Sequence, residues 1–336
     1  MDTEKKDNEQ RLVMSSYVKY LRLIVLSYIG RFWVALILVA GLAYAASAIV
    51  DLDLDFSKLE ILSAPYLLAA VVLHILFWIT LSYGWRQILG LHHHDRPSFS
   101  ECFIQVSIVN IGKYMPGKVW GMLARGKYLN DKNFGLDNIV RSTYIEQLTF
   151  IHAAIILSAL LFAALKPSPV SIAITLALLP SIYLFVRYQD SLLILLSRIA
   201  GKALGSQQFN TSSIVGYREY SVLLLIYGLI WLLSGMVFSC LSFAFLNMEG
   251  TLALVVLLVF VNTVSILSGF LAFFSPGGLG VREVVGASML STAMPLGDAV
   301  ILVTLYRVWL IAADLIGGGI AVYASRPLSR TRQSQP

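Results

Sequence analysis

Two Pro-Gly turns that carry basic side chains interrupt the apolar part of this chain, one in each half. The first lies in segment 113–125 (KYMPGKVWGMLAR) and the second in segment 275–283 (SPGGLGVRE). Proline lacks the backbone N–H and glycine readily adopts positive φ angles, so both segments are predicted to be broken helices. In a membrane protein, paired interruptions at matching positions of two halves indicate a substrate site.

The residues of these turns are suited to binding an anionic head group. A broken helix exposes backbone N–H groups and the positive end of its dipole. Arginine can grip a phosphate through two parallel hydrogen bonds, and lysine supplies a compact positive charge. Alternatively, Pro-Gly only turns the chain, and the basic side chains reach for the membrane interface. The candidate binding residues are Pro116, Gly117, Lys118, Arg125, Pro276, Gly277, Gly278, Gly280, Arg282 and Glu283.

Titratable residues also fall inside apolar stretches, where a charge costs a few kcal/mol or more unless it is paired or hydrated. They are Glu146, His152, Arg307 and Asp314. Glu146 follows Asp137 by nine residues and Arg307 follows Asp298 by nine, so a repeat would place them at equivalent depths. We therefore predict a Glu146–Arg307 ion pair, acting either as a gate or as a static clasp.

The composition indicates an integral membrane protein. Of the 336 residues, 57% are hydrophobic and 13% are charged, which is too apolar for a soluble domain. The net charge of +6 comes from basic residues scattered between apolar stretches, so no nucleic-acid partner is expected. Cys102 and Cys240 stand alone in apolar sequence, which indicates packing. Segment 92–95 (HHHD) lacks the ligand spacing of zinc signatures, and no metal or cofactor is expected.

Hydropathy predicts the elements that position these residues. Apolar stretches approach or exceed the roughly 20 residues that cross a bilayer at 32–50, 65–89, 142–165, 170–187, 221–246 and 299–323. Two further regions, about 99–127 and 251–294, are interrupted by the Pro-Gly turns and are expected to be re-entrant hairpins. The predicted fold is an all-α polytopic membrane protein with about six spanning helices and two re-entrant broken-helix hairpins. The alternative is eight spanning helices, because residues 251–275 are long enough to span alone.

The distribution of Lys and Arg predicts the topology. Residues 1–31 form a basic cytoplasmic segment, and residues 325–336 form a cytoplasmic tail. Every Lys/Arg-rich connection is cytoplasmic only if both broken regions return to the side they entered from. The order span, span, hairpin, span then occurs twice with opposite orientation, in residues 32–165 and 170–324 of one transmembrane domain. This is an inverted-topology repeat.

At these motifs the chain resembles the membrane region of lysylphosphatidylglycerol synthase/flippase proteins, and the stand-alone flippase-like membrane proteins that share it. Residues 110–125, 144–146, 275–283 and 306–307 carry the resemblance, which covers roughly residues 17–324. It implies movement of a lipid with a charged or polar head group between leaflets of the bacterial inner membrane. Because only about a dozen residues follow Tyr323, no aminoacyl-transfer domain and no lipid aminoacylation are expected.

The leading functional prediction is a lipid flippase-like transporter for a phospholipid or polyprenyl-phosphate-type lipid. No hydrolase, zinc-protease or Walker motif is present in the sequence, which favours a transporter over an enzyme without deciding the question. One alternative is an intramembrane enzyme acting on a lipid-linked substrate, with Glu146 or Glu283 as acid or base. The other is a non-catalytic anchor of an envelope-biogenesis assembly. The expected partners are a membrane lipid and envelope polysaccharide or lipid-modifying enzymes.

Overall fold

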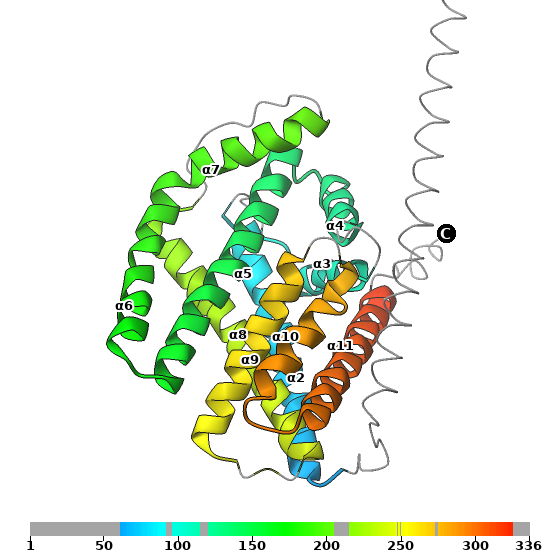
Figure 1. The fold of residues 1–336 in the computed structure, drawn as a ribbon. Helices are drawn as coiled ribbons and strands as arrows, with labels where there is room; N and C mark the ends of the chain where they lie inside the picture. The colour runs from blue at the N-terminus through cyan, green and yellow to red at the C-terminus, as the bar shows by residue number, and fades with distance from the viewer. Residues whose placement is uncertain are drawn as a thin grey trace, which may run out of the picture. The chain divides into compact units, whose positions relative to one another are not determined.

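The computed structural model describes residues 61–91, 96–114, 120–204, 215–246, 248, 250–272 and 275–324. All elements in these ranges are helices (Figure 1). They are α2 (Ala64–Leu89), α3 (Phe99–Gly112), α4 (Trp120–Asn130), α5 (Leu136–Leu165), α6 (Pro169–Leu178), α7 (Pro180–Leu204), α8 (Tyr217–Phe245), α9 (Leu252–Leu271), the 3-10 turn η2 (Pro276–Gly278), α10 (Val281–Leu290) and α11 (Leu296–Ala324). The predicted span 32–50, the N-terminal segment 1–31 and the tail 325–336 lie outside the described residues.

Six of the described helical segments are long and apolar enough to cross a membrane. Five correspond to the spans predicted at 65–89, 142–165, 170–187, 221–246 and 299–323, although α8 ends at Phe245, one residue before its predicted end. The sixth is α9, which belongs to the region predicted to be the second hairpin. These helices confirm the all-α polytopic membrane fold. They also show that the first arm of the second hairpin has the length of a spanning helix.

Large apolar side chains are exposed on the outer helices. On α6, Val170, Ile172 and Leu176 are all exposed, and Ile316 and Val322 of α11 are exposed as well. Apolar surface of this extent is unfavourable in water and favourable against lipid chains. The outer surface therefore agrees with the apolar composition, and the protein is an integral membrane protein.

The span predicted at 170–187 is broken at Pro180, where α6 ends and α7 begins, and α7 continues to Leu204. Proline has no N–H to donate to the preceding turn, so the series of backbone hydrogen bonds is interrupted there. Ser168 starts α6 by accepting a hydrogen bond from the Ser171 N–H, with Pro169 in the first turn. The apolar sequence continues on both sides of Pro180, so the hydropathy pattern alone predicted one uninterrupted span.

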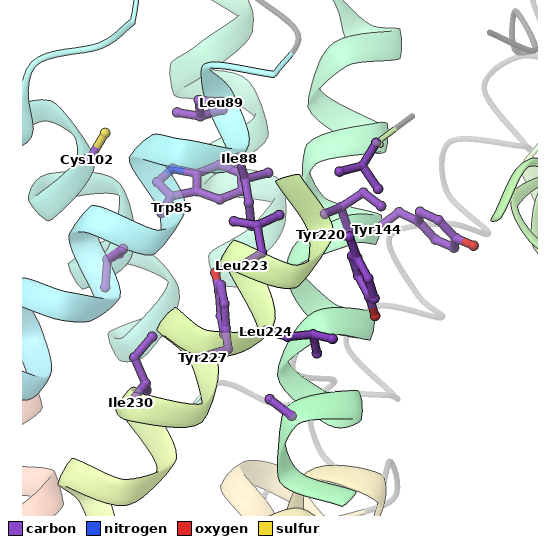
Figure 2. Close-up of a cluster of buried hydrophobic side chains, with 14 of the residues drawn as sticks. Trp85, Ile88, Leu89, Cys102, Tyr144, Tyr220, Leu223, Leu224, Tyr227 and Ile230 are labelled. Carbon is purple, nitrogen blue, oxygen red and sulfur yellow. The ribbon is translucent and has the colours of Figure 1, made fainter. Parts of the chain in front are cut away.

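Helices α2 and α8 pack against each other in opposite directions and form the centre of the fold. At the start of α2, the Leu62 N–H donates to the Ala244 carbonyl near the end of α8 at 2.9 Å. Near the other end, Trp85 of α2 and Tyr227 of α8 belong to the buried cluster in Figure 2. A second cluster includes Ala70 of α2 and residues from the C-terminal half of α8. The two clusters therefore mark opposite ends of the α2–α8 pair.

The hairpin α3–α4 has both of its ends at the first cluster. Cys102, in the first turn of α3, and Leu129, in the last turn of α4, are both buried in it. Beyond α4, the Lys132 ammonium binds the Glu101 carboxylate at the start of α3. This hydrogen bond lowers the pKa of Glu101 and raises the pKa of Lys132. The chain thus enters and leaves the hairpin at the same end of the bundle.

The hairpin α9–α10 has both of its ends at the second cluster, because Leu254 of α9 and Met289 of α10 pack against it. In Figure 1, α9 and α10 run beside each other and α10 leads back to the start of α11. The two hairpins therefore enter the bundle from opposite ends. The inverted repeat remains a prediction, because its first span lies outside the described residues.

Candidate functional site

A cavity of about 230 Å³ lies between the two hairpins. Its walls come from α2, α3, α4, α5, α8, α9, η2, α10 and α11. Phe150, Tyr227 and Trp231 contribute aromatic surface. The charged residues that line it are Lys113, Arg125, Glu146, Arg282, Arg307 and Asp314. The cavity thus places several charges inside an otherwise apolar bundle.

The second Pro-Gly turn forms one wall of this cavity. Gly277, Gly278 and Gly280 have φ angles of 58°, 73° and 82°, which L-residues with a side chain rarely adopt. Gly278 also lies directly against Gly269 of α9, since a methyl group at 278 would be 2.8 Å from the Gly269 Cα. Glu283 accepts the Gly280 N–H at 2.7 Å and so caps α10. The glycines let the chain reverse tightly, as the sequence predicted for this segment.

The first hairpin is closed by a similar glycine contact. A methyl group on Gly112, at the end of α3, would lie 2.2 Å from the Cα of Gly121 in α4. The backbones of the two helices therefore touch at this point. Of the predicted binding residues, Pro116, Gly117 and Lys118 lie in segment 115–119, outside the described residues.

Arg125 of α4 forms a buried ion pair with Glu146 of α5. Arg125 Nη1 lies 3.0 Å from Glu146 Oε1, and Nη2 lies 2.5 Å from Oε2. The Arg125 guanidinium also stacks over the Trp85 ring at 3.7 Å from the ring centroid. Arg125 is only 1% exposed. Its charge is therefore neutralised locally by a two-point contact, the strongest geometry for such a pair.

Asp314 of α11 binds the end of α3. It lies 2.8 Å from the Lys113 ammonium and accepts a hydrogen bond from the Tyr114 hydroxyl at 2.6 Å. Asp314 is 4% exposed, whereas the Lys113 side chain is 39% exposed, so the carboxylate is buried and the ammonium remains partly accessible. Sequence reasoning chose Asp314 because of its depth in a span, but Tyr114 carried no comparable signal.

Arg307 of α11 binds the second Pro-Gly turn. Its Nη1 donates to the Gly277 carbonyl at 2.8 Å and lies 3.6 Å from Glu283 Oε1. The predicted Glu146–Arg307 ion pair is therefore wrong, since Glu146 pairs with Arg125 instead. Glu146 and Arg307 were expected to pair because the repeat would place them at equal depth in the membrane. Equal depth does not make them neighbours, because the short helices α4 and α10 supply nearer partners.

Arg282 of α10 is 9% exposed and lines the cavity. Its guanidinium lies 5.4 Å from the Tyr306 ring centroid, a cation–π contact. Its backbone carbonyl accepts the Ser265 hydroxyl at 2.7 Å, which fixes the start of α10 against α9. Arg282 thus combines a firmly held backbone with a guanidinium directed at the cavity.

The cavity brings together part of the predicted set. Predicted residues among its lining are Arg125, Glu146, Gly277, Arg282, Arg307 and Asp314. Gly278, Gly280 and Glu283 belong to the second Pro-Gly turn and the start of α10, but they do not line the cavity. His152 is hydrogen-bonded to Tyr220 and Ser181 instead, at 2.8 and 2.7 Å. In the described ranges, no three His, Cys, Asp or Glu side chains converge on a metal position.

Lining residues that the sequence analysis did not select include His74 of α2. Its Nδ1 accepts the Trp309 indole N–H at 3.1 Å.

The two hairpins share one sequence pattern. In both 112–125 and 269–282, a first glycine is followed after eight residues by a second glycine, and after three more residues by an arginine. In both places the two glycines touch and the arginine lines the cavity.

Comparison with known protein families gave a match over most of the chain. Residues 32–318 match the family model described as "Lysylphosphatidylglycerol synthase TM region". Searches of curated proteins and of solved structures found no match. The matched range contains all the residues that line the cavity.

Proposed function

The chain belongs to the family of the lysylphosphatidylglycerol synthase membrane region, and we propose that it moves a lipid between leaflets of a bacterial cytoplasmic membrane. The lipid would carry an anionic or polar head group. The family match supports a role connected with membrane lipids, and the helices provide the membrane setting. The class of head group is part of the proposal.

The observation that carries this proposal is the charged cavity between the two hairpins. Ionisable groups inside a membrane protein are costly and commonly mark a substrate pathway. Four basic and two acidic residues line this cavity beside aromatic surface. Such a lining can hold a polar head group while the acyl chains remain among apolar neighbours.

The contacts between the two hairpins support a transport cycle in which the cavity opens to one side of the membrane and then to the other. A transporter with two related halves exposes one site to each side in turn. Asp314 holds Lys113 near the first turn, and Arg307 holds Gly277 in the second. A methyl group at 277 would lie 3.5 Å from the Tyr114 ring, so the two hairpins nearly touch. Breaking and reforming these contacts would open the cavity toward one leaflet or the other.

A vesicle assay tests the proposal. The purified protein is reconstituted into phosphatidylcholine vesicles that contain a trace of fluorescent phosphatidylglycerol in both leaflets. Dithionite added outside then bleaches only label that reaches the outer leaflet. We expect the protein to make the inner-leaflet label accessible, and mass spectrometry to show the recovered lipid unchanged.

Two results would contradict transport. Inner-leaflet label that stays as protected as in protein-free vesicles would exclude exchange of this lipid. A recovered lipid of altered mass would instead favour the intramembrane enzyme. Neutral labelled phosphatidylcholine, run in parallel, reports whether movement depends on the charge of the head group.

A further inference from the structure

Two buried guanidinium groups in the cavity carry N–H groups without hydrogen-bond partners. In the described part of the chain, Arg282 Nη2 has no partner, and neither have Nε and Nη2 of Arg307. The two side chains are 9% and 7% exposed. Leaving a buried charged donor unpaired costs free energy, so these groups call for an acceptor that the chain itself does not supply.

The other two basic residues of the lining are already engaged. Arg125 makes its two-point contact with Glu146, and Lys113 lies 2.8 Å from Asp314. Each pair is neutral overall. Neither side chain is therefore available for a ligand unless its partner is displaced.

The charge balance near Arg282 and Arg307 is incomplete. Both face the same cavity, and Glu283, 3.6 Å from Arg307 Nη1, is the nearby carboxylate. Among the charged residues of the lining together with Glu283, one positive charge remains in excess. A buried cation without a counter-charge is strongly unfavourable. A ligand with a single negative charge would complete the site.

We propose that Arg282 and Arg307 form a subsite for a monoanionic phosphate group. A phosphodiester carries one negative charge, and its oxygens match the planar fork of donors on a guanidinium. The proposal rests on the proposed function, in which a lipid head group enters this cavity. It makes Arg307 a binding residue rather than a gate, and Arg125 a structural residue rather than a binding one.

Binding of a short-chain lipid tests the subsite without requiring transport. The protein in detergent is titrated with dioctanoylphosphatidylglycerol and, separately, with dioctanoylglycerol, which lacks the phosphate. The intrinsic tryptophan fluorescence of the protein, to which Trp231 of the cavity lining contributes, provides the readout. Inorganic phosphate added as a competitor distinguishes a lipid head group from free phosphate as the source of the anion.

The variants are Arg282→Gln, Arg307→Gln and Arg282→Lys. Lys127→Gln is the matched control, because it removes the same charge from an exposed position of α4. We expect each Gln variant to weaken binding of the phospholipid by about tenfold or more, the effect of losing a charged hydrogen bond. Arg282→Lys should bind with intermediate affinity, and Lys127→Gln should bind like the unmodified protein. Thermal unfolding of each variant separates lost binding from lost folding.

Equal affinity for the phospholipid and for dioctanoylglycerol would overturn the subsite, as would normal phospholipid binding by both folded Gln variants. Displacement of the lipid by inorganic phosphate would uphold the subsite and extend it to free phosphate. Failure of displacement, with the variants impaired, would assign it to the lipid head group. Vesicles that show no lipid exchange would contradict the proposed function and leave this binding result standing.

Discussion

Arg125 and Arg282 occupy corresponding positions in their hairpins, yet their electrostatic surroundings differ. Arg125 is matched by Glu146 on the next long helix, whereas the corresponding long helix of the second half carries Arg307. The sequence could mark Arg282 and Arg125 as candidates because each follows a Pro-Gly turn. It could not distinguish their roles, because a partner 21 residues away on another helix leaves no local pattern.

Removal of one partner of the Arg125–Glu146 pair should be strongly destabilising. Glu146→Gln leaves the Arg125 guanidinium, 1% exposed, without its carboxylate, and breaking such a buried pair costs about 3–5 kcal/mol. We expect a clearly lower thermal unfolding midpoint in detergent. Asp137→Asn, an exposed change on the same helix, should cost at most about 1 kcal/mol.

A double variant separates the interaction energy between Arg125 and Glu146 from the contacts that each side chain makes with its other neighbours. Arg125→Gln combined with Glu146→Gln removes both charges and should recover part of the stability lost in Glu146→Gln. If the losses of the two single variants simply add, the coupling that the geometry indicates is absent.

At the scale of elements, each hairpin contains a pair of glycines whose backbones lie in close contact. Gly112 at the end of α3 meets Gly121 of α4, and Gly269 of α9 meets Gly278 of the turn η2, with the same spacing in both halves. The Pro-Gly turns predicted where the helices break. They did not predict this contact, because close backbone approach depends on the angle between arms, which hydropathy does not encode.

Gly112→Ala should separate the arms of the first hairpin. The new methyl group would lie 2.2 Å from the Gly121 Cα, a distance that only backbone movement can relieve. We expect a loss of about 1–3 kcal/mol of stability, the usual cost of overpacking. Gly228→Ala in α8 is the control, because nothing lies within 4 Å of its new methyl group and alanine favours a helix. Equal unfolding midpoints for the two variants would contradict the tight crossing.

The helices themselves were largely predictable, because stretches of apolar residues of membrane-spanning length leave few alternatives. The length of α9 agrees with the alternative that residues 251–275 are long enough to span alone. The break at Pro180 was not predictable, because it lies within a continuous apolar run, and hydropathy reports that a segment is apolar without measuring its continuity.

At the scale of the whole molecule, the long helix that follows each hairpin packs on the hairpin of the other half. Helix α5, which follows the first hairpin, packs on α9, and α11, which follows the second, packs on α3. If the two halves were exchanged, the contact of α5 with α9 would take the place of the contact of α11 with α3. Basic residues in connecting loops predict an inverted repeat, which remains a prediction. The packing of each half on the other, which builds one cavity, could not be read from charge alone.

The orientation in the membrane can be tested by cysteine labelling. In a background with Cys102→Ala and Cys240→Ala, single cysteines are introduced at the exposed positions Gly250, Thr292 and Asn130. We expect a membrane-impermeant reagent to label the cysteines at 250 and 292 from outside and to reach the one at 130 only after the membrane is opened. Labelling of 250 and 292 from opposite sides would contradict the re-entrant second hairpin.

The most direct test of the central claim compares lipid exchange by the unmodified protein, Arg282→Gln and Lys127→Gln in the same vesicles. If the head group passes through the cavity between the hairpins, Arg282→Gln should lose about tenfold or more of the exchange rate, because a charged hydrogen bond to the substrate is removed. Lys127→Gln should retain the full rate. Exchange by Arg282→Gln at the unmodified rate, with the protein folded and reconstituted to the same density, would contradict passage through this cavity.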